Sequence, residues 1–243
     1  MKKFHDVFSI CPSWLCFTFD NPIRKLIHKP KEILKDYLKK GDKILDLGPG
    51  MGYFTFPIGR MVGKHGIVYA ADIQNQMLLH IEKRIIKEKW KNIRTYLIKD
   101  KIRINEKVDF VLMFWMLHEI KNIEIVIDNL KEILNQNGKI LIVEPIIHVT
   151  KKDFTNEIDI MIKNGFKIIK YPKINLSRSV LIEASPRQAR GECSACTGSA
   201  ARHRKVKKSI SSSLANPATS GGVSARCRGL KKQLTIRVHP GEG

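Results

Sequence analysis

The chain has 243 residues, which is long enough for one folded domain with a sizeable core and additional segments. It carries 44 Lys and Arg against 23 Asp and Glu, a formal net charge of +21, so nucleic acid has to be considered as a partner. It has no run of about 18 or more uninterrupted apolar residues, so we expect no membrane span. The five cysteines suggest no disulfide framework, which favours a cytoplasmic location.

The charge is unevenly spread along the chain. Residues 186–243 hold 12 Lys and Arg but 2 Asp and Glu, a net +10, which leaves 32 basic and 21 acidic residues, or +11, in residues 1–185. The segment 186–243 has no Phe, Tyr or Trp, and so polar a segment cannot offset the entropy of ordering. We therefore predict a disordered basic tail outside the fold. It is either an arm that binds RNA or anionic surfaces or, as we favour, an extension foreign to the fold.

Residues 1–29 form a separate N-terminal segment in this prediction. Two lysines before an apolar run imitate a signal peptide, but Pro12 and Asp20 interrupt the run and no small-residue cleavage site follows. Cys193 and Cys196 have the spacing of half a zinc site without a second ligand pair at a suitable distance, so we expect no metal. A soft metal site remains a weaker alternative, with the ligands Cys11, Cys16, His118 and His148.

Strands and helices alternate along residues 30–185, which we take as the folded domain. In chain order the apolar pattern predicts a helix at 30–39, a strand at 43–47, a helix at 53–62, a strand at 66–71, a helix at 74–88, strands at 93–98 and 108–114, a helix at 123–134, a strand at 139–143, a helix at 153–163, and strands at 166–170 and 179–183. Such an alternation predicts an α/β fold, a doubly wound, mostly parallel sheet with helices on both sides.

The stretch ILDLGPGMGYFTF joins the first strand to the next helix through Gly48, Gly50 and Gly52. Glycine loops in this position let the backbone come close to a cofactor at the helix N-terminus. A dinucleotide fingerprint needs its third glycine at Tyr53, and the loop has no Gly-Lys-Ser/Thr for a nucleoside triphosphate. The spacing therefore favours a nucleoside cofactor without phosphates.

Three acids stand at or just beyond the carboxyl ends of the first three predicted strands. Asp46 suits an ammonium group, Asp72 two ribose hydroxyls, and Asp100 an adenine amino group, so S-adenosylmethionine fits best. Each acid also has a purely structural explanation. Asp46 could cap N–H groups of the loop, Asp72 could cap the helix at 74–88, and Asp100 could lie in a solvated turn.

The blocks DLGPGMG, ADIQ, KD and DFVLMFWMLHEI resemble the class I S-adenosylmethionine-dependent methyltransferases in order and spacing over residues 30–185. With CPSWLCFTFDNP, EPIIHV and SRSVL, the chain looks like a little-characterised prokaryotic subgroup of that family. The resemblance implies a Rossmann-like sheet of seven strands whose last strand is antiparallel. It also implies a cofactor site. Asp46, Gly48, Gly50 and Gly52 would bind the methionine half of the cofactor, Asp72 the ribose, and Ile73 with Asp100 the adenine.

Candidates for acid–base chemistry stand after the fourth and fifth strands. They are His118, Glu119, Glu144 and His148. A base is needed only where the methyl acceptor carries a proton, since alignment does most of the work in methyl transfer. A structural role is equally open for each of them. A lone histidine is often one whose hydrogen bonds are satisfied within the fold. Glu119 could stabilise a helix by lying at its positively polarised N-terminus, and Glu144 could simply be the residue at which a strand ends.

Aromatic residues flank the same region. Phe114 and Trp115 could face the cofactor's sulfonium group and the acceptor, or pack in the core. Trp14 and Phe17, with Asp20, could close over the pocket as a lid, or anchor the N-terminal segment.

Neither an Asn-Pro-Pro-Tyr motif nor a Pro-Cys or Thr-Cys nucleophile occurs in the folded part, which favours a small-molecule acceptor. The alternative is an RNA-directed methyltransferase or nucleic-acid-binding module, which needs the lysines gathered on one face around the pocket. A binder of the cofactor without catalytic activity is a third possibility.

Overall fold

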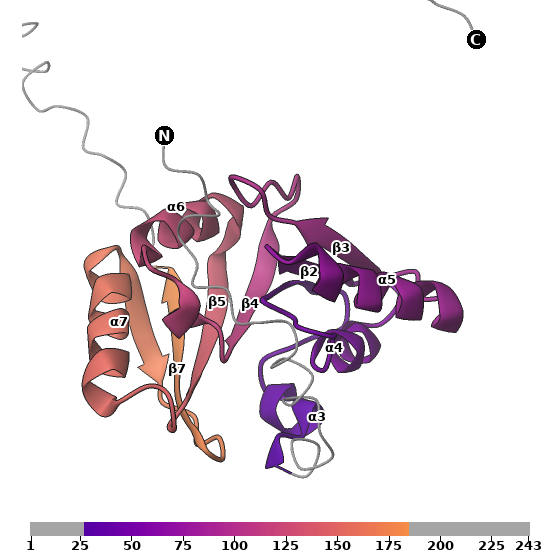
Figure 1. The fold of residues 1–243 in the computed structure, drawn as a ribbon. Helices are drawn as coiled ribbons and strands as arrows, with labels where there is room; N and C mark the ends of the chain where they lie inside the picture. Colours follow the sequence, from indigo (N-terminus) through magenta and orange to yellow (C-terminus); the bar gives the residue numbers. More distant parts are fainter. Residues whose placement is uncertain (1–26, 185–243) are drawn as a thin grey trace, which may run out of the picture. The chain divides into compact units, whose positions relative to one another are not determined.

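The computed structural model describes residues 27–184 (Figure 1). Its helices are α3 (Pro30–Leu34), α4 (Thr55–Val62), α5 (Asn75–Glu88), α6 (Ile123–Ile133) and α7 (Lys151–Lys163), with a 3₁₀ turn η2 (Leu117–Glu119). Its strands are β1 (Lys43–Leu47), β2 (Ile67–Asp72), β3 (Ile93–Leu97), β4 (Val108–Phe114), β5 (Leu134–Pro145), β6 (Phe166–Lys170) and β7 (Ser177–Ala184). Of the predicted N-terminal segment 1–29, the structure describes residues 27–29 only, and the predicted tail at 186–243 lies outside the described residues.

One seven-stranded sheet organises the domain, with the strand order β3-β2-β1-β4-β5-β7-β6. The strands from β3 to β5 pair in parallel, whereas β7 runs antiparallel to both β5 and β6. The predicted fold class, including an antiparallel last strand, is confirmed. The strand order reverses beside β1, which pairs with β2 on one side and β4 on the other, and ligands of open α/β sheets bind at the carboxyl ends of the strands at such a point.

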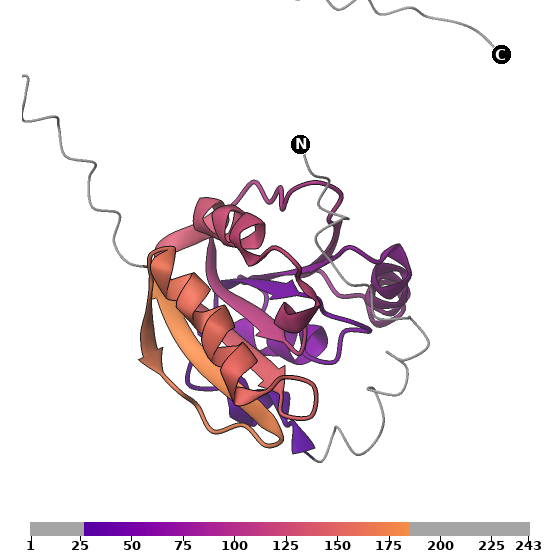
Figure 2. The same ribbon diagram turned by 60° about the vertical axis from the view of Figure 1, so that its left-hand side comes forward.

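Two apolar layers lie against the two faces of the sheet. β4 alternates between them: Phe110, Leu112 and Phe114 belong to one cluster, and Val111 and Met113 to the other. α3, α4 and α5 contribute to the first cluster, and α6 and α7 to the second. Figure 2 shows α7 in front of the orange strand beside it. The continuous apolar run of β4 is therefore a strand buried on both faces, as predicted.

Two predicted boundaries differ from the structure by more than two residues. The helix predicted at 30–39 ends at Leu34, and the chain then turns so that the ring of Tyr37 stacks on Phe110 at 6.1 Å. β5 begins at Leu134, which was predicted to be helical, because Leu134 already pairs with Val108 of β4. Contacts between elements decide both positions. Among residues 27–184, no helix is long and apolar enough to cross a membrane.

Candidate functional site

The glycine loop leaves β1 at the point where the strand order reverses. All three glycines have positive φ angles, 70° at Gly48, 54° at Gly50 and 88° at Gly52. A Cβ atom at Gly52 would lie 2.7 Å from the ring of Phe56, and one at Gly48 would lie 3.0 Å from Cβ of Met116. At Gly50 a Cβ atom would meet nothing within 4 Å. Two of the glycines are thus required for packing inside the protein, and the third exposes its backbone to open space.

Asp46 is buried in β1, with 2% of its surface exposed. Its Oδ2 accepts a hydrogen bond of 2.6 Å from the hydroxyl of Thr55, the first residue of α4. The carboxylate therefore ties the strand to the helix on the far side of the loop. A contact of Asp46 with a ligand ammonium group stays a prediction.

Asp72 ends β2 and is 8% exposed. Its Oδ1 accepts a 2.8 Å hydrogen bond from the backbone N–H of Gln74, the residue that caps α5. Burial raises the pKa of Asp72 to about 6, against the backbone N–H groups of Gln74 and Ile73, which lower it. Asp72 therefore holds the residue before α5 in place, but it is not the helix cap considered for it, because the N-cap is Gln74 and no side-chain hydrogen bond caps the helix. Ile73 is partly buried against the core, and the ribose and adenine roles of the two residues stay predictions.

Asp100 lies in an exposed turn after β3. Its carboxylate forms an ion pair of 2.5 Å with Arg103, and both side chains are more than half exposed. This is the arrangement of a solvated turn. A contact with adenine stays a prediction.

His118 and Glu144 meet where η2 approaches the end of β5. Glu144 is fully buried, and its two oxygens accept hydrogen bonds from the backbone N–H of Leu117, at 2.7 Å, and from Nδ1 of His118. Burial lowers the pKa of His118, but the hydrogen bond and charge of Glu144 outweigh it, so the pKa is raised. The side chain of His118 is 28% exposed. With Nδ1 bonded to a carboxylate, Nε2 is left as the imidazole's proton acceptor.

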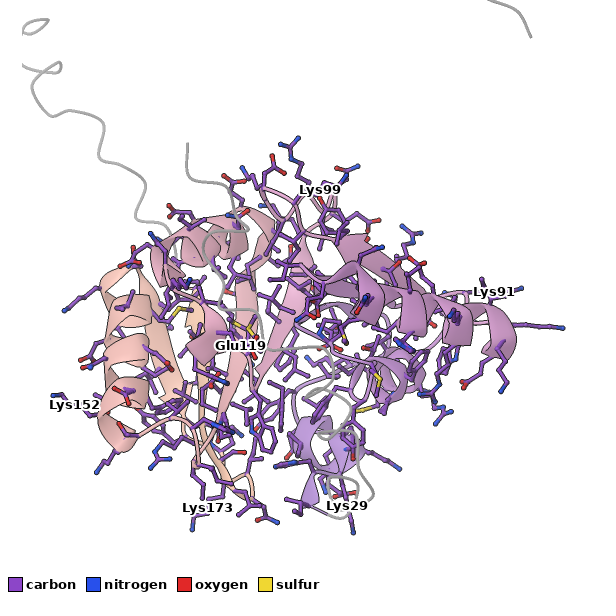
Figure 3. The ribbon with its side chains drawn as sticks, in the orientation of Figure 1. Lys29, Lys91, Lys99, Glu119, Lys152 and Lys173 are labelled. Carbon is purple, nitrogen blue, oxygen red and sulfur yellow. The ribbon has the colours of Figure 1, made fainter. Side chains whose placement is uncertain are left out.

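The charges of His118 and of Asp72 both act on Glu119, so this residue links the pair electrostatically with the end of β2. Burial raises the pKa of Glu119 to about 7; the charge of His118 opposes the shift, and those of Asp72 and Glu144 add to it. Glu119 thus lies within electrostatic reach of carboxylates at the ends of both β2 and β5. In Figure 3 it lies near the middle of the view, while the labelled lysines lie around the outside.

Two further groups complete what we call the acidic cluster, defined as His118, Glu119, Glu144, His148 and Glu157. The ring of His148 stacks on that of His118, with 6.2 Å between centroids. Glu157, on α7, was missed at the sequence level. Burial, together with the charge of Glu144, raises the pKa of Glu157 to about 7. The sequence pattern that could have indicated Glu157 is a carboxylate on the same face of a helix as the buried Phe154, Ile158 and Met161.

Trp115 follows β4 in a strained left-handed conformation, with φ at 60°. Its backbone N–H donates to Val143 at 2.7 Å, and its indole N–H donates to the hydroxyl of Ser177 at 3.0 Å. The rings of Phe114 and Trp115 pack edge-on against His28, at 5.1 Å and 5.0 Å. His28 is 1% exposed and was also missed. Phe114 is buried in the core, and its contact with the cofactor stays a prediction.

An open pocket of about 550 Å³ lies between α3 and the loop after β6. The predicted site residues do not line it. Its lining is Ile27, Lys29, Glu32, Ile33, Asp36, Tyr37, Lys170, Pro172, Lys173, Ile174 and Asn175. Within residues 27–184, no three His, Cys, Asp or Glu side chains are arranged to hold a metal ion. Trp14, Phe17, Asp20, Cys11 and Cys16 lie outside the described residues.

Comparisons with known proteins agree with the fold. Residues 45–140 match a family model described as a methyltransferase domain. The ubiquinone/menaquinone biosynthesis C-methyltransferase UbiE of Pasteurella multocida is 28% identical over 115 residues, which cover 44% of this chain and 41% of that protein. A probable cobalt-precorrin-6B C(15)-methyltransferase (decarboxylating) of Saccharolobus solfataricus is 28% identical over 148 residues, 59% of this chain and 70% of that protein. This chain therefore spans less than half of the Pasteurella protein.

A solved structure with the same fold is a SAM-dependent methyltransferase from Aquifex aeolicus. It aligns with a TM-score of 0.64 at 22% identity, over 72% of this chain and all of that one.

Proposed function

Because this chain belongs to the class I S-adenosylmethionine-dependent methyltransferases, we propose that it methylates a small molecule whose reacting atom carries a proton. The observation that supports this most directly is the hydrogen bond between His118 and the fully buried Glu144. It orients an imidazole at the carboxyl end of the sheet, where ligands of such folds bind. An oriented imidazole with a free Nε2 is suited to accept a proton.

The loop and the acids fit S-adenosylmethionine as the cofactor. Gly50 presents backbone to open space, and the nearly buried Asp72 offers a carboxylate to hydroxyl donors. When bound, this cofactor supplies an electrophilic methyl group on a positively charged sulfonium. We assign the methionine half to the glycine loop with Asp46, the ribose to Asp72, and the adenine to Ile73 and Asp100.

In this proposal His118 is the general base. The acceptor gives up its proton to Nε2 while Nδ1 keeps its hydrogen bond to Glu144, so the imidazolium that forms stays paired. Glu144 is the positioning residue, and the backbone N–H of Leu117 fixes its other oxygen. Glu119 stands between this pair and Asp72 and is half protonated near neutral pH, so it is a second candidate base.

Charge supports a small acceptor over RNA. The acidic cluster gathers three carboxylates around His118, and phosphates near them would be repelled. The labelled lysines in Figure 3, which are Lys29, Lys91, Lys99, Lys152 and Lys173, point away from one another around the molecule. The names of the two relatives, for ubiquinone/menaquinone biosynthesis and for cobalt-precorrin-6B, also support a small acceptor.

Calorimetry on the full chain tests the cofactor. We expect binding of S-adenosylmethionine and of its demethylated product, and no binding of NAD. Transfer of a labelled methyl group is then measured with a panel of small phenols, amines and carbon acids, and with total RNA. His118→Asn should lower the transfer rate about 100-fold or more with unchanged cofactor affinity. Binding of NAD alone, or transfer to RNA in preference to the panel, would overturn the proposal.

A further inference from the structure

We propose that Glu157 is a positioning residue for His118, and that its carboxylate stabilises the imidazolium formed when His118 takes up a proton. The inference deepens the proposed function and rests on it for the source of the proton. It concerns a residue within helix α7, whereas the other members of the acidic cluster lie at or just after the ends of β4 and β5.

Helix α7 holds Glu157 on its buried side. Phe154, Ile158 and Met161 are 7%, 3% and 1% exposed, and Glu157 falls on the same stripe, three residues after Phe154 and four before Met161. The hydroxyl of Thr150 caps the helix by accepting the N–H of Asp153 at 3.2 Å. The helix start is therefore fixed, and Glu157 lies on the face of α7 that carries the buried residues.

One oxygen of this carboxylate has no hydrogen-bond donor. Oε2 of Glu157 is buried and accepts no hydrogen bond from any residue in the described range 27–184. Burying a carboxylate oxygen without a hydrogen-bond donor costs free energy, and this cost falls when a positive charge comes near. The charge of Glu157 acts on His118, and the charge of His118 acts back on Glu157. A protonated His118 supplies that positive charge.

The surrounding charges make the pair responsive near neutral pH. His118 faces Glu144 from β5, Glu119 from its own turn and Glu157 from α7, with His148 stacked on its ring. Glu157 faces Glu144 and His118, and also Asp153 on its own helix. Burial and the charge of Glu144 favour the protonated form of Glu157, whereas a charged His118 favours the ionised form. When His118 gains the acceptor's proton, the partly exposed Glu157 can release its own proton to solvent, and the net charge of the cluster does not change.

The test is a nuclear magnetic resonance titration of the full chain with isotope-labelled histidine, in which His118→Asn identifies the His118 signal. Glu157→Gln keeps the shape and removes the charge, so the midpoint of His118 should move to lower pH. Asp159→Asn changes an exposed carboxylate on the same helix and should leave the midpoint in place. An unchanged midpoint in Glu157→Gln would overturn the proposal.

A reciprocal measurement covers the case in which Glu157→Gln does not fold. With labelled glutamate, the midpoint of Glu157 should rise in His118→Asn, because the positive partner is lost. An unchanged Glu157 midpoint would contradict the coupling. Neither titration needs cofactor or acceptor, so absent cofactor binding would refute the proposed function and leave this coupling measurable.

Discussion

The candidate site has two halves, a loop half with the glycine loop, Asp46 and Asp72, and a cluster half with the acidic cluster. The contacts that build them differ in the number of residues that separate the partners along the chain. On the glycine-loop side, Asp72 bonds the N–H two residues on, and Asp46 bonds a hydroxyl nine residues on. On the side of the acidic cluster, Glu144 bonds groups 26 and 27 residues away. Each acid of the first half is therefore held within its own strand–loop–helix unit, Asp46 within β1–α4 and Asp72 within β2–α5, whereas the second half forms only when β4, β5 and α7 have packed together.

The electrostatics of the halves differ in the same way. Asp46 and Asp72 are each fixed by hydrogen bonds to neighbours along the chain, and both are predicted to bind the cofactor. Glu119 and Glu157 are held near a pKa of about 7, where a proton is easily gained or lost. We therefore expect that the loop half binds the cofactor and that the cluster half transfers protons, so that substitutions in the first change binding and stability and those in the second change pH dependence.

The largest effect is expected in the loop half. Gly52→Ala forces a Cβ atom to within 2.7 Å of Phe56 at a φ of 88°, so the free energy of unfolding should fall by about 2–4 kcal/mol. Gly50→Ala is the matched control, because it meets open space and should lose about 1 kcal/mol from its positive φ alone. Urea unfolding of both variants checks this. Equal losses of stability in the two variants would mean that Gly52 is not packed against the ring of Phe56.

Asp72→Asn should weaken cofactor binding by about 1.5–3 kcal/mol, roughly 10- to 100-fold, because it removes the charge from bonds to the ribose. In the unmodified protein the affinity should also fall as the pH drops below about 6, where Asp72 becomes protonated. The variant should show no such fall. Calorimetry with the demethylated product at several pH values measures both. A pH dependence that persists in the variant would assign it to another group.

The sequence predicts the loop half better than the cluster half, because the contacts of the loop half join residues that are close along the chain. The glycines and the acids at strand ends can be read from a short motif, and β4 and β6 were predicted to the residue from their apolar runs. His118, Glu119, Glu144 and His148 were candidates because they follow strands, but their convergence depends on sheet register. Glu157 and His28 were missed because only packing between distant elements brings them to the site.

In the cluster half a substitution should stabilise the fold. The pKa of Glu119 is about 7 in the folded protein against an ordinary value of 4.5, so the folded state binds more protons between these values. Its stability therefore falls as the pH rises through this window. Glu119→Gln should raise Tm by about 2–4 °C above pH 7, and the gain should vanish as the pH falls towards 4.5. Calorimetric melting with exposed Glu124→Gln as control measures it; a loss of stability above pH 7 would mean that Glu119 is paired.

The smallest effect tests a contact that holds β4 and β7 together beside the site. Ser177→Ala removes the acceptor of the Trp115 indole N–H, and Ser177 in turn donates to the carbonyl of Asn175 that His28 also contacts. Because this end of the sheet is only half buried, water can replace the lost partner, and we expect a loss of about 0.5–1 kcal/mol with unchanged cofactor affinity. Trp115→Phe removes the same hydrogen bond from the other side. In a double-mutant cycle, the loss of stability in the double variant should therefore be smaller than the sum of the losses in the two single variants. Full additivity would mean that the indole and the hydroxyl act independently.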